Sequence, residues 1–479
     1  MRVPVDTRHV QFLGLTGSAV LAACGVAVGA VPVREVLAPR SEAAVLGLAG
    51  AYFGLVLLIA AWALLGRAIR GPEPPAPRTL LLTLALWAAP LLAAPPLFSR
   101  DVYSYLAQGA MVDARMDVYA QGPAHLGGPL TYEVAPIWQH TPTPYGPVFL
   151  ACAAAIAGFA RAEVSTGILG MRLVALLGVA LMVFCLPRLA RRCGADPRTA
   201  LWLGALNPLL LLHLVAGAHN DAVMLGLLGA GLVAALGWWP VAGAVLVTLA
   251  ALVKAPAALG LLAVALLWAR RLDGRLPRLR AVLAVTGVSA ATTAATTALT
   301  GTGYGWIAAL DTPVSPQNWS LTSSLGRMTG AALTSLGSSL AEFALPAWHT
   351  AGIAATVLAM IAFWRRHHLR RPVYALGLSL TAVALLGPAI RPWYVLWGLF
   401  LIAAAAPSGS IRLRRAAAVA SGMLALAVLP SGFAPDGTQL LLAVGGGAAA
   451  VLVLWCAYQL NARGSSSGRG RTEPLGSPV

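Results

Sequence analysis

Runs of apolar residues close to the length of a membrane span recur along the whole chain. A bilayer has a hydrocarbon core about 30 Å thick, so a crossing helix needs roughly 20 mostly apolar residues. Short polar or arginine-rich stretches separate the runs, and they leave no room for a large soluble domain. The pattern predicts an all-α polytopic membrane protein with about 13–15 transmembrane helices. The predicted spans are 10–31, 44–66, 79–97, 166–187, 199–217, 221–237, 240–253, 256–269, 280–300, 346–364, 372–388, 392–406, 413–429 and 438–460.

One apolar run, 147–160, is short for a full crossing. If it did cross, the arginines of 188–198 would lie on the outer side, so we interpret it as a partial or re-entrant helix. Such backbone is tolerated at membrane depth only where protein buries it or where it lines a wet cavity. The run therefore predicts a site nearby. The first apolar run, 11–31, is long enough to remain as a span, so no cleavable signal peptide is expected.

Composition and charge support the membrane interpretation. Of the 479 residues, 58% are hydrophobic and 10% are charged, against about 25% charged in an ordinary soluble domain. The formal charge of +17 comes from arginines clustered between apolar runs, and such clusters favour the cytoplasmic side. We expect contact with membrane lipids and no nucleic-acid partner. The clusters assigned to the cytoplasm, with the N-terminus, are Arg67/Arg70/Arg78, Arg188–Arg198, Arg270–Arg280, Arg365–Arg371, Arg412–Arg415 and Arg463–Arg471.

The chain is predicted to form a single integral membrane domain, 1–460, followed by a disordered cytoplasmic tail, 461–479. Two long loops, 98–146 and 301–345, fall on the outer face, and long loops in compact proteins are usually functional. The first loop opens with 101–114, which is expected to form an external helix in the membrane interface after the third span.

The sequence offers no signal for a resident cofactor. It contains no nucleotide-binding glycine loop and no zinc-protease motif, so no metal ligands are assigned. A divalent cation stays an open alternative. The five cysteines have no metal-like spacing and are interpreted as packing residues: Cys24, Cys152, Cys185, Cys193 and Cys456.

Asp101 is the candidate catalytic residue. It lies in "FSRDVYSYLAQG", directly after the third predicted span, where a carboxylate facing the outer bilayer surface could act as a general base. Two structural alternatives stay open at this stage: Asp101 could cap the interface helix, or it could pair with Arg100.

Two cationic residues are candidates for binding a phosphate. Lys254 is the only lysine of the chain and precedes the helix-breaking Pro256. It could be a point charge on a phosphate or a side chain that merely snorkels to the interface. Arg391, in "GPAIRPWYVLWG", lies at the outer end of a span. An isolated arginine there runs against the positive-inside trend, which favours a bidentate phosphate clamp.

Polar and aromatic residues of three further stretches are candidates for binding sugar hydroxyls and ring faces. They lie in the first outer loop, in "HLVAGAHNDAVMLG" and after Arg391. Structural alternatives are helix capping by Asn220 or Asp221, and interface anchoring by the aromatic side chains. The candidates are Tyr103, Tyr105, Trp138, Gln139, His140, Tyr145, His219, Asn220, Asp221, Trp393 and Tyr394.

Four stretches together carry a family resemblance: "SRDVYSYLAQG", "TPTPYGP", "NPLLLLHLVAGAHNDAVMLG" and "RPWYVLWG". They resemble the actinobacterial polyprenol-phosphate-mannose-dependent α-1,6-mannosyltransferases, membrane glycosyltransferases with the GT-C fold. The similarity runs over about 98–400. The sequence departs from the GT-C pattern in one respect, because Asp101 stands without an adjacent acidic residue, and Asp113 and Asp117 follow only downstream.

The resemblance implies a GT-C-like fold and an inverting transfer of mannose. The donor would be polyprenyl-phosphate-mannose, and the acceptor an α-1,6-mannan of the lipomannan or lipoarabinomannan type. The expected location is a bacterial plasma membrane, with an external active site and a cytoplasmic N-terminus. Two alternatives stay open: a transporter or lipid flippase, and a GT-C enzyme that uses another lipid-phosphate sugar such as arabinose.

Overall fold

The structure is a computed structural model that describes residues 6–30, 41–161, 163–311, 320–367, 371–432 and 436–467. Throughout these residues the regular elements are helices, and none of them is a β-strand. The predicted all-α class is therefore confirmed. The long helices of the first half are α1 (Thr7–Val28), α2 (Glu42–Ile69), α3 (Pro77–Ala93), α4 (Asp101–Asp113), α7 (Pro147–Ala160), α8 (Val164–Cys193), α10 (Asp221–Leu236) and α11 (Pro240–Ala251).

The second half continues in the same way. Its longer helices are α12 (Gly260–Ala269), α13 (Pro277–Thr300), α14 (Leu321–Ser335), α15 (Ala344–His367), α16 (Pro372–Leu386), α17 (Val395–Ala405), α18 (Ile411–Ala425) and α19 (Gly437–Ser467). Shorter elements connect them: η2 (Pro123–Leu126), α5 (Gly128–Glu133), α6 (Pro136–Gln139), α9 (Pro197–Gly204), η3 (Leu210–Ala216), η4 (Ala255–Leu259), η5 (Gly305–Asp311), η6 (Ser339–Phe343) and η7 (Pro392–Tyr394).

Local sequence explains many helix starts and ends. Seven helices without a capping side chain have proline in their first turn: α3, α5, α6, α7, α11, α13 and α16. The N–H that proline lacks would have no partner within the helix at that position. Elsewhere a side chain caps the helix, as when Ser41 Oγ accepts from the Ala44 N–H. Gly194 and Gly301 end α8 and α13 in the left-handed conformation that glycine adopts without strain.

Six helices in the described part of the chain are long and apolar enough to cross a membrane. They are α1, α2, α8, α13, α19 and the helix formed by η6 with α15; the bent pair of η3 and α10 would make a seventh. Six further apolar helices have only 10–17 residues. The expected spans therefore divide into full-length helices and shorter apolar helices. The short run 147–160 is such a helix, α7.

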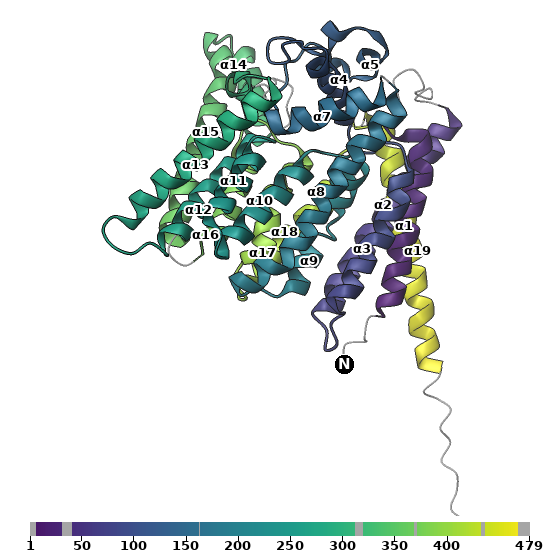
Figure 1. Cartoon of the computed structure of the whole chain (residues 1–479). Coiled ribbons are helices and arrows are strands. Elements are labelled where there is room, and N and C mark those ends of the chain that lie inside the picture. Colours follow the sequence, from purple (N-terminus) through teal and green to yellow (C-terminus); the bar gives the residue numbers. More distant parts are fainter. Residues whose placement is uncertain are drawn as a thin grey trace, which may run out of the picture.

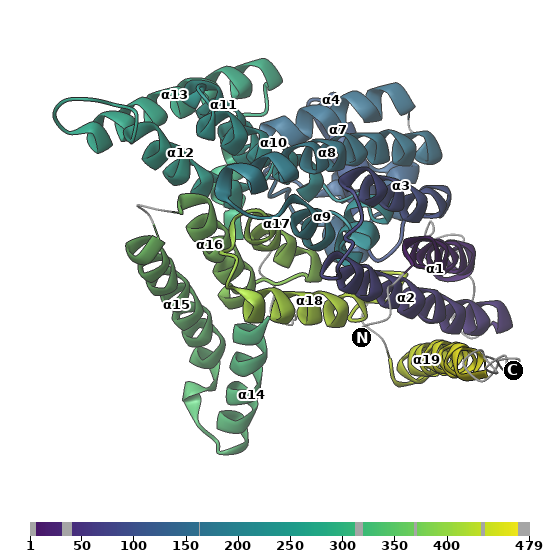
Figure 2. The same cartoon turned by 90° about the horizontal axis from the view of Figure 1, so that it is seen from below.

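The helices pack side by side into one bundle (Figure 1). α1 packs against α2 and α3, and α19 covers α2. α8 and α10 lie near the centre, where α8 contacts α7, α9 and α17. Seen along the bundle, α15 and α19 lie on opposite sides of the molecule (Figure 2). α4 and α7 cross at the end of the bundle that is remote from the N-terminus.

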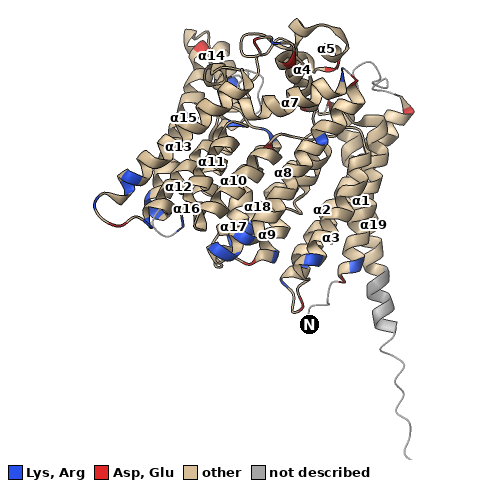
Figure 3. Ribbon diagram, in the orientation of Figure 1, with Lys and Arg blue, Asp and Glu red and all other residues tan. Residues whose placement is uncertain are grey.

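Charge is distributed unevenly between the two ends of the bundle. Most Lys and Arg residues gather at the end near the N-terminus, in the connections that follow α2, α8, α12 and α15 (Figure 3). Acidic residues lie mostly at the end that carries α4 and α5. α16 links the two ends: it starts after Arg371 and ends before Arg391, and its 15 residues span roughly 22 Å.

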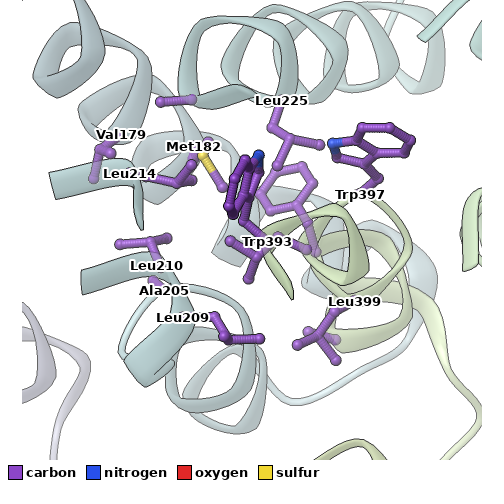
Figure 4. Close-up of a cluster of buried hydrophobic side chains, with 14 of the residues drawn as sticks. Val179, Met182, Ala205, Leu209, Leu210, Leu214, Leu225, Trp393, Trp397 and Leu399 are labelled. Atoms are coloured by element: carbon purple, nitrogen blue, oxygen red, sulfur yellow. The ribbon is translucent and has the colours of Figure 1, made fainter. Parts of the chain in front are cut away.

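A large apolar core fills the centre of the bundle. It joins α8, α9, η3, α10 and α17, and its side chains interdigitate across these elements (Figure 4). Trp393 and Trp397 reach into this core from η7 and α17. Because a close-packed core resists displacement, the segment that carries Arg391 and these tryptophans has a firm support.

Three segments differ from their sequence-based description. The second outer loop, 301–345, is largely helical, because η5, α14 and η6 occupy most of its described residues. The predicted span 199–217 is broken at 205–207, between α9 and the segment that continues into the π-helix η3. Pro208 directly follows the break, as suits a residue that is tolerated in the first turn of a helix and not in its interior. α19 runs on to Ser467, so only part of the predicted tail lies beyond it, and 468–479 lie outside the described residues.

Candidate active site

A cavity of about 390 Å³ opens where α4 meets the interrupted helices. Its walls come from one face of α4, from the segment after α6, from the break between α11 and η4, and from the connection between α16 and η7. The side chains with polar or aromatic chemistry are Asp101, Ser104, Gln108, Trp138, Thr141, Tyr145, Lys254, Arg391, Tyr394 and Trp397.

Asp101 is the first residue of α4. The N-cap position belongs to Arg100, which makes no side-chain capping bond, and Ser99 Oγ accepts from the Asp101 backbone N–H at 3.1 Å. Asp101 therefore does not cap the helix. Its side chain is 19% exposed and faces the cavity, so a ligand bound there can reach it.

The charges that act on Asp101 come from across the cavity. Burial raises the pKa of the Asp101 carboxyl, and the positive charges of Arg391 and Lys254 oppose that rise. Arg100 forms no hydrogen bond or ion pair with the Asp101 side chain in the described structure. It is itself buried and is influenced by Glu133. The proposed pairing of Asp101 with Arg100 is therefore wrong.

Lys254 is held firmly at the floor of the cavity. Its Nζ donates to both carboxylate oxygens of Asp221, at 3.0 and 2.9 Å, and it lies 4.6 Å from the ring centroid of Tyr394. Trp397 Nε1 also donates to Asp221. Only 12% of the Lys254 side chain is exposed, so it does not snorkel to the interface.

A glycine brings the Tyr145 segment against the Lys254 segment. A Cβ on Gly146 would lie 2.2 Å from the carbonyl oxygen of Leu252, so only glycine fits there. The Val148 N–H then donates to that same oxygen at 3.2 Å. This contact explains "PYGP" in physical terms: the glycine allows close approach, and Pro147 starts α7.

Arg391 lies in extended backbone between Ile390 and η7. Its guanidinium carbon is 5.9 Å from the ring centroid of Trp138. Within the described chain no carboxylate forms an ion pair with it, and its NH1 makes only a long, 3.4 Å bond to the carbonyl of Ile390. This guanidinium therefore keeps most of its donors for a ligand.

A buried polar layer lies behind Asp101. His219 Nδ1 is 3.6 Å from Asp101 Oδ2 and 3.1 Å from the Tyr105 hydroxyl, while its ring stacks on Trp393 at 4.0 Å. The chain reaches this position through the π-helix η3 and a left-handed residue, Ala218. The chain bends by 106° between η3 and α10, and His219 lies in this bend, fully buried behind the cavity wall. π-helical turns such as η3 often occur at functional sites.

The structure thus brings together six of the residues predicted from the sequence, which all line the cavity: Asp101, Trp138, Tyr145, Lys254, Arg391 and Tyr394. Tyr105, His219, Asp221 and Trp393 lie directly behind the wall. Asn220 is buried beside them and makes no side-chain capping bond to α10.

Three predicted sugar-binding residues lie elsewhere. Tyr103 is fully buried, and its hydroxyl donates to the Ala30 carbonyl at 2.6 Å. Gln139 donates to the carbonyls of Thr131 and Val134. His140 is exposed and does not line the cavity. All three are neighbours in sequence of residues that do face the cavity, and their helices turn them away from it.

Sequence reasoning missed several wall residues. Ser104 and Gln108 follow Asp101 at helical spacing on the same face of α4, so the period of the helix was a signal that could have found them. Ser104 Oγ is buried without a hydrogen-bond partner, which suits it to a ligand. No spacing in the sequence links Thr141 or Trp397 to Asp101 in this way. Among the described residues, no three His, Cys, Asp or Glu side chains gather to hold a metal.

Comparison with known proteins gives this cavity a context. A family model described as "Alpha-(1->6)-mannopyranosyltransferase, N-terminal domain" matches residues 11–270, and one described as "MptB C-terminal domain" matches residues 322–457. The chain belongs to the alpha-(1->6)-mannopyranosyltransferase family. The resemblance to α-1,6-mannosyltransferases that was drawn from four sequence stretches is thereby confirmed. Asp101 and Lys254 lie in the first matched region and Arg391 in the second, so both regions build the cavity.

Individual relatives cover most of the chain. A probable alpha-(1->6)-mannopyranosyltransferase of Mycolicibacterium smegmatis is 34% identical over 84% of this chain and 79% of its own length. Alpha-(1->6)-mannopyranosyltransferase A of Mycobacterium tuberculosis is 35% identical over 89% of this chain and 84% of its own. Alpha-(1->6)-mannopyranosyltransferase B of Corynebacterium glutamicum is 34% identical over 73% and 64%. No solved structure matches the chain significantly.

Proposed function

We propose that this protein is an inverting mannosyltransferase that moves mannose from polyprenyl-phosphate-mannose to a primary hydroxyl of an α-1,6-mannan acceptor. One observation carries the proposal: a single cavity holds a carboxylate, Asp101, opposite two cations, Arg391 and Lys254. The names of the family members supply the sugar and the linkage.

Arg391 binds the donor phosphate in this mechanism. A guanidinium presents two parallel N–H groups to phosphate oxygens, and this one has no carboxylate partner in the described structure. Its position between α16 and η7 suits a phosphate at headgroup depth. The isoprenoid chain of the donor then stays in the leaflet, while the mannosyl group enters the cavity.

Lys254 adds a fixed positive charge. The Asp221 carboxylate occupies two of its three N–H donors, so one donor is left for the phosphate. Fixed groups of this kind stabilise charge that grows during bond breaking without reorganising. Lys254 and Arg391 therefore stabilise the phosphate as it leaves more than they strengthen the initial binding of the donor.

Asp101 takes the proton of the acceptor. The acceptor hydroxyl oxygen attacks C1 of mannose and gives its proton to the carboxylate. The bond from C1 to the phosphate oxygen breaks, and its electron pair stays on polyprenyl phosphate. The leaving group is already a stable anion, so no general acid is needed, in contrast to the two carboxylates of most glycosidases. Attack from the face opposite the phosphate converts a β-linked donor into an α-linked product.

The reaction is assigned to the outer face of the membrane. The cavity is lined by α4, which lies at the bundle end away from the arginine-rich connections (Figure 3), and arginine-rich connections favour the cytoplasm. The long chain of a mannan acceptor is accommodated more easily outside the bilayer than in a site closed by helices.

A reconstituted transfer assay tests the proposal. Purified protein is incubated with polyprenyl-phosphate-mannose and an α-1,6-linked mannose disaccharide, and products are analysed by mass spectrometry and linkage analysis. We expect a trisaccharide with a new α-1,6 bond. A parallel reaction with polyprenyl-phosphate-arabinose serves as the control for sugar identity. Transfer of arabinose alone, or a β-linked mannose product, contradicts the proposal.

A further inference from the structure

A second cavity, of about 900 Å³, lies beside the active site. We call it the α4–α13 cavity. Its walls are the end of α4 with the following turn, 112–120, and the end of α13 with the following loop, 298–308, together with Ala154 of α7. Its size falls within the usual range for sites that bind small ligands.

Two connections join the α4–α13 cavity to the active site. The Tyr119 hydroxyl, from the second cavity, donates to the carbonyl of Tyr145, which lines the first, at 3.1 Å. η5 passes from one cavity to the other, because Ala308 lines the second and Leu310 the first. A Cβ on Gly305 would lie 2.5 Å from the Tyr119 Cβ, so the glycine lets this loop close against the turn.

The wall chemistry selects the kind of ligand. Asp113, Arg115, Asp117 and the hydroxyls of Thr300 and Thr302 all line the cavity, with Tyr119 as its aromatic surface. Two carboxylates against one guanidinium give the wall a net negative charge, which repels an anionic lipid headgroup. A neutral polyol is favoured instead, since its hydroxyls can donate to carboxylates and accept from a guanidinium.

The charged groups are available for such a ligand. No hydrogen bond or ion pair joins the side chains of Asp113 or Arg115 to another described residue. Asp117 Oδ1 accepts from the N–H groups of Tyr119 and Ala120, which fixes the turn and leaves Oδ2 for a ligand.

We propose that the α4–α13 cavity is a saccharide-binding subsite that holds sugar residues of the acceptor remote from the reacting end. The inference rests on the proposed function, because it extends the same acceptor away from Asp101. It assigns to this surface a preference for long acceptors over short ones.

The test compares acceptors of two lengths. Asp113→Asn and Arg115→Ala each remove a charge from the cavity wall, and both residues are exposed, so the fold is expected to persist. Arg161→Ala is the matched control: Arg161 is also an exposed arginine with a positive φ, of 47° against 60° for Arg115, and it lies outside the cavity wall.

For each wall variant we expect the KM of a long α-1,6-linked mannan oligosaccharide to rise about tenfold, the loss expected for one hydrogen bond to a charged group. The KM of the disaccharide and that of the donor stay at the parental values, and Arg161→Ala changes none of them. Equal changes for both acceptors, or no change for the long one, overturn the subsite.

Isothermal titration calorimetry with the long oligosaccharide, without donor, separates this inference from the proposed function. If the parental protein transfers no mannose, the proposed function fails, and the subsite is still decided by binding. Weaker binding by Asp113→Asn and Arg115→Ala than by Arg161→Ala supports it, and equal binding by all four proteins contradicts it.

Discussion

At the scale of single residues, the proposed mechanism relies on one base and two cations, and the two cations differ in their surroundings. Lys254 is bound to Asp221 at 2.9 Å, whereas Arg391 has no ion-pair partner within the described ranges. Sequence alone could nominate both cations, because each is an isolated charge at a helix break. It could not predict their difference, since the contact between Lys254 and Asp221 depends on how α10 and α11 pack.

Arg391 variants test phosphate capture. We expect Arg391→Ala to lower kcat/KM for the donor by about 10- to 100-fold, as for a charged hydrogen bond of about 1.5–3 kcal/mol. Arg391→Lys should recover only part of this loss, because an ammonium cannot replace a bidentate fork. Steady-state kinetics at varied donor concentration provide the measurement. Unchanged donor kinetics in a folded Arg391→Ala protein would reduce Arg391 to an interface anchor.

The electrostatic coupling of Asp101 to Arg391 predicts a pH effect. The base must be ionised, so kcat/KM should rise with pH through the pKa of Asp101. Burial raises that pKa, which places the acidic limb above the ordinary value of about 3.9. Arg391 lowers the pKa, so removing its charge in Arg391→Ala should move the limb to higher pH. A limb that stays in place or moves to lower pH in the pH–rate profile would refute this coupling.

At the scale of helices, the site depends on breaks and close crossings. Proline and glycine marked the breaks in the sequence, and the short run 147–160 forms the helix α7, which contacts α4. The partial membrane crossing of this run stays a prediction. The second outer loop was predicted incorrectly. It contains α14, a helix of 15 residues that packs on α15. Because α14 is shorter than a full membrane span, the pattern of apolar runs did not indicate it.

The crossing of α4 and α7 gives an element-scale prediction. A Cβ on Gly109 would lie 2.3 Å from the Ala153 carbonyl oxygen, so Gly109→Ala should force α4 away from α7. We expect a loss of stability of about 1–3 kcal/mol, together with reduced transfer because α4 carries Asp101. The melting temperature in detergent and the transfer rate report the two effects.

Gly158→Ala on α7 is the matched control. Its Cβ would meet the Asp113 carboxyl at 3.5 Å, an ordinary contact, and alanine favours a helix over glycine by up to about 1 kcal/mol. Its melting temperature should equal or exceed that of the parental protein. If both variants behave alike, the close crossing of α4 and α7 does not control the site.

The whole molecule separates an arginine-rich end from the end that holds the active site (Figure 3). The arginine clusters of the sequence predicted this polarity, because they lie in short connections between apolar runs and were assigned to one side of the membrane. The pattern of each single helix could not predict that Asp101, Lys254 and Arg391 line one cavity. Lys254 follows Asp101 by 153 positions along the chain, and Arg391 follows it by 290. The three residues meet only through the packing of α8, α10 and α17.

Introduced cysteines test the orientation of the bundle. In a background with the five native cysteines replaced by alanine, His125→Cys lies in the segment predicted to be external and Arg366→Cys at the arginine-rich end of α15. A membrane-impermeant thiol reagent added to intact cells should label the first and spare the second. The reverse labelling would invert the topology and move the active site to the cytoplasm.

Asp101→Asn tests the central claim most directly. The substitution keeps the size of the side chain and removes its ability to accept a proton, and the structure assigns no helix cap to Asp101. Positioned bases typically contribute about 10²–10⁴ in rate, so kcat for mannose transfer from polyprenyl-phosphate-mannose should fall by that factor, while the melting temperature stays at the parental value. Transfer at close to the parental rate by a folded Asp101→Asn protein would contradict the assignment of Asp101 as the base.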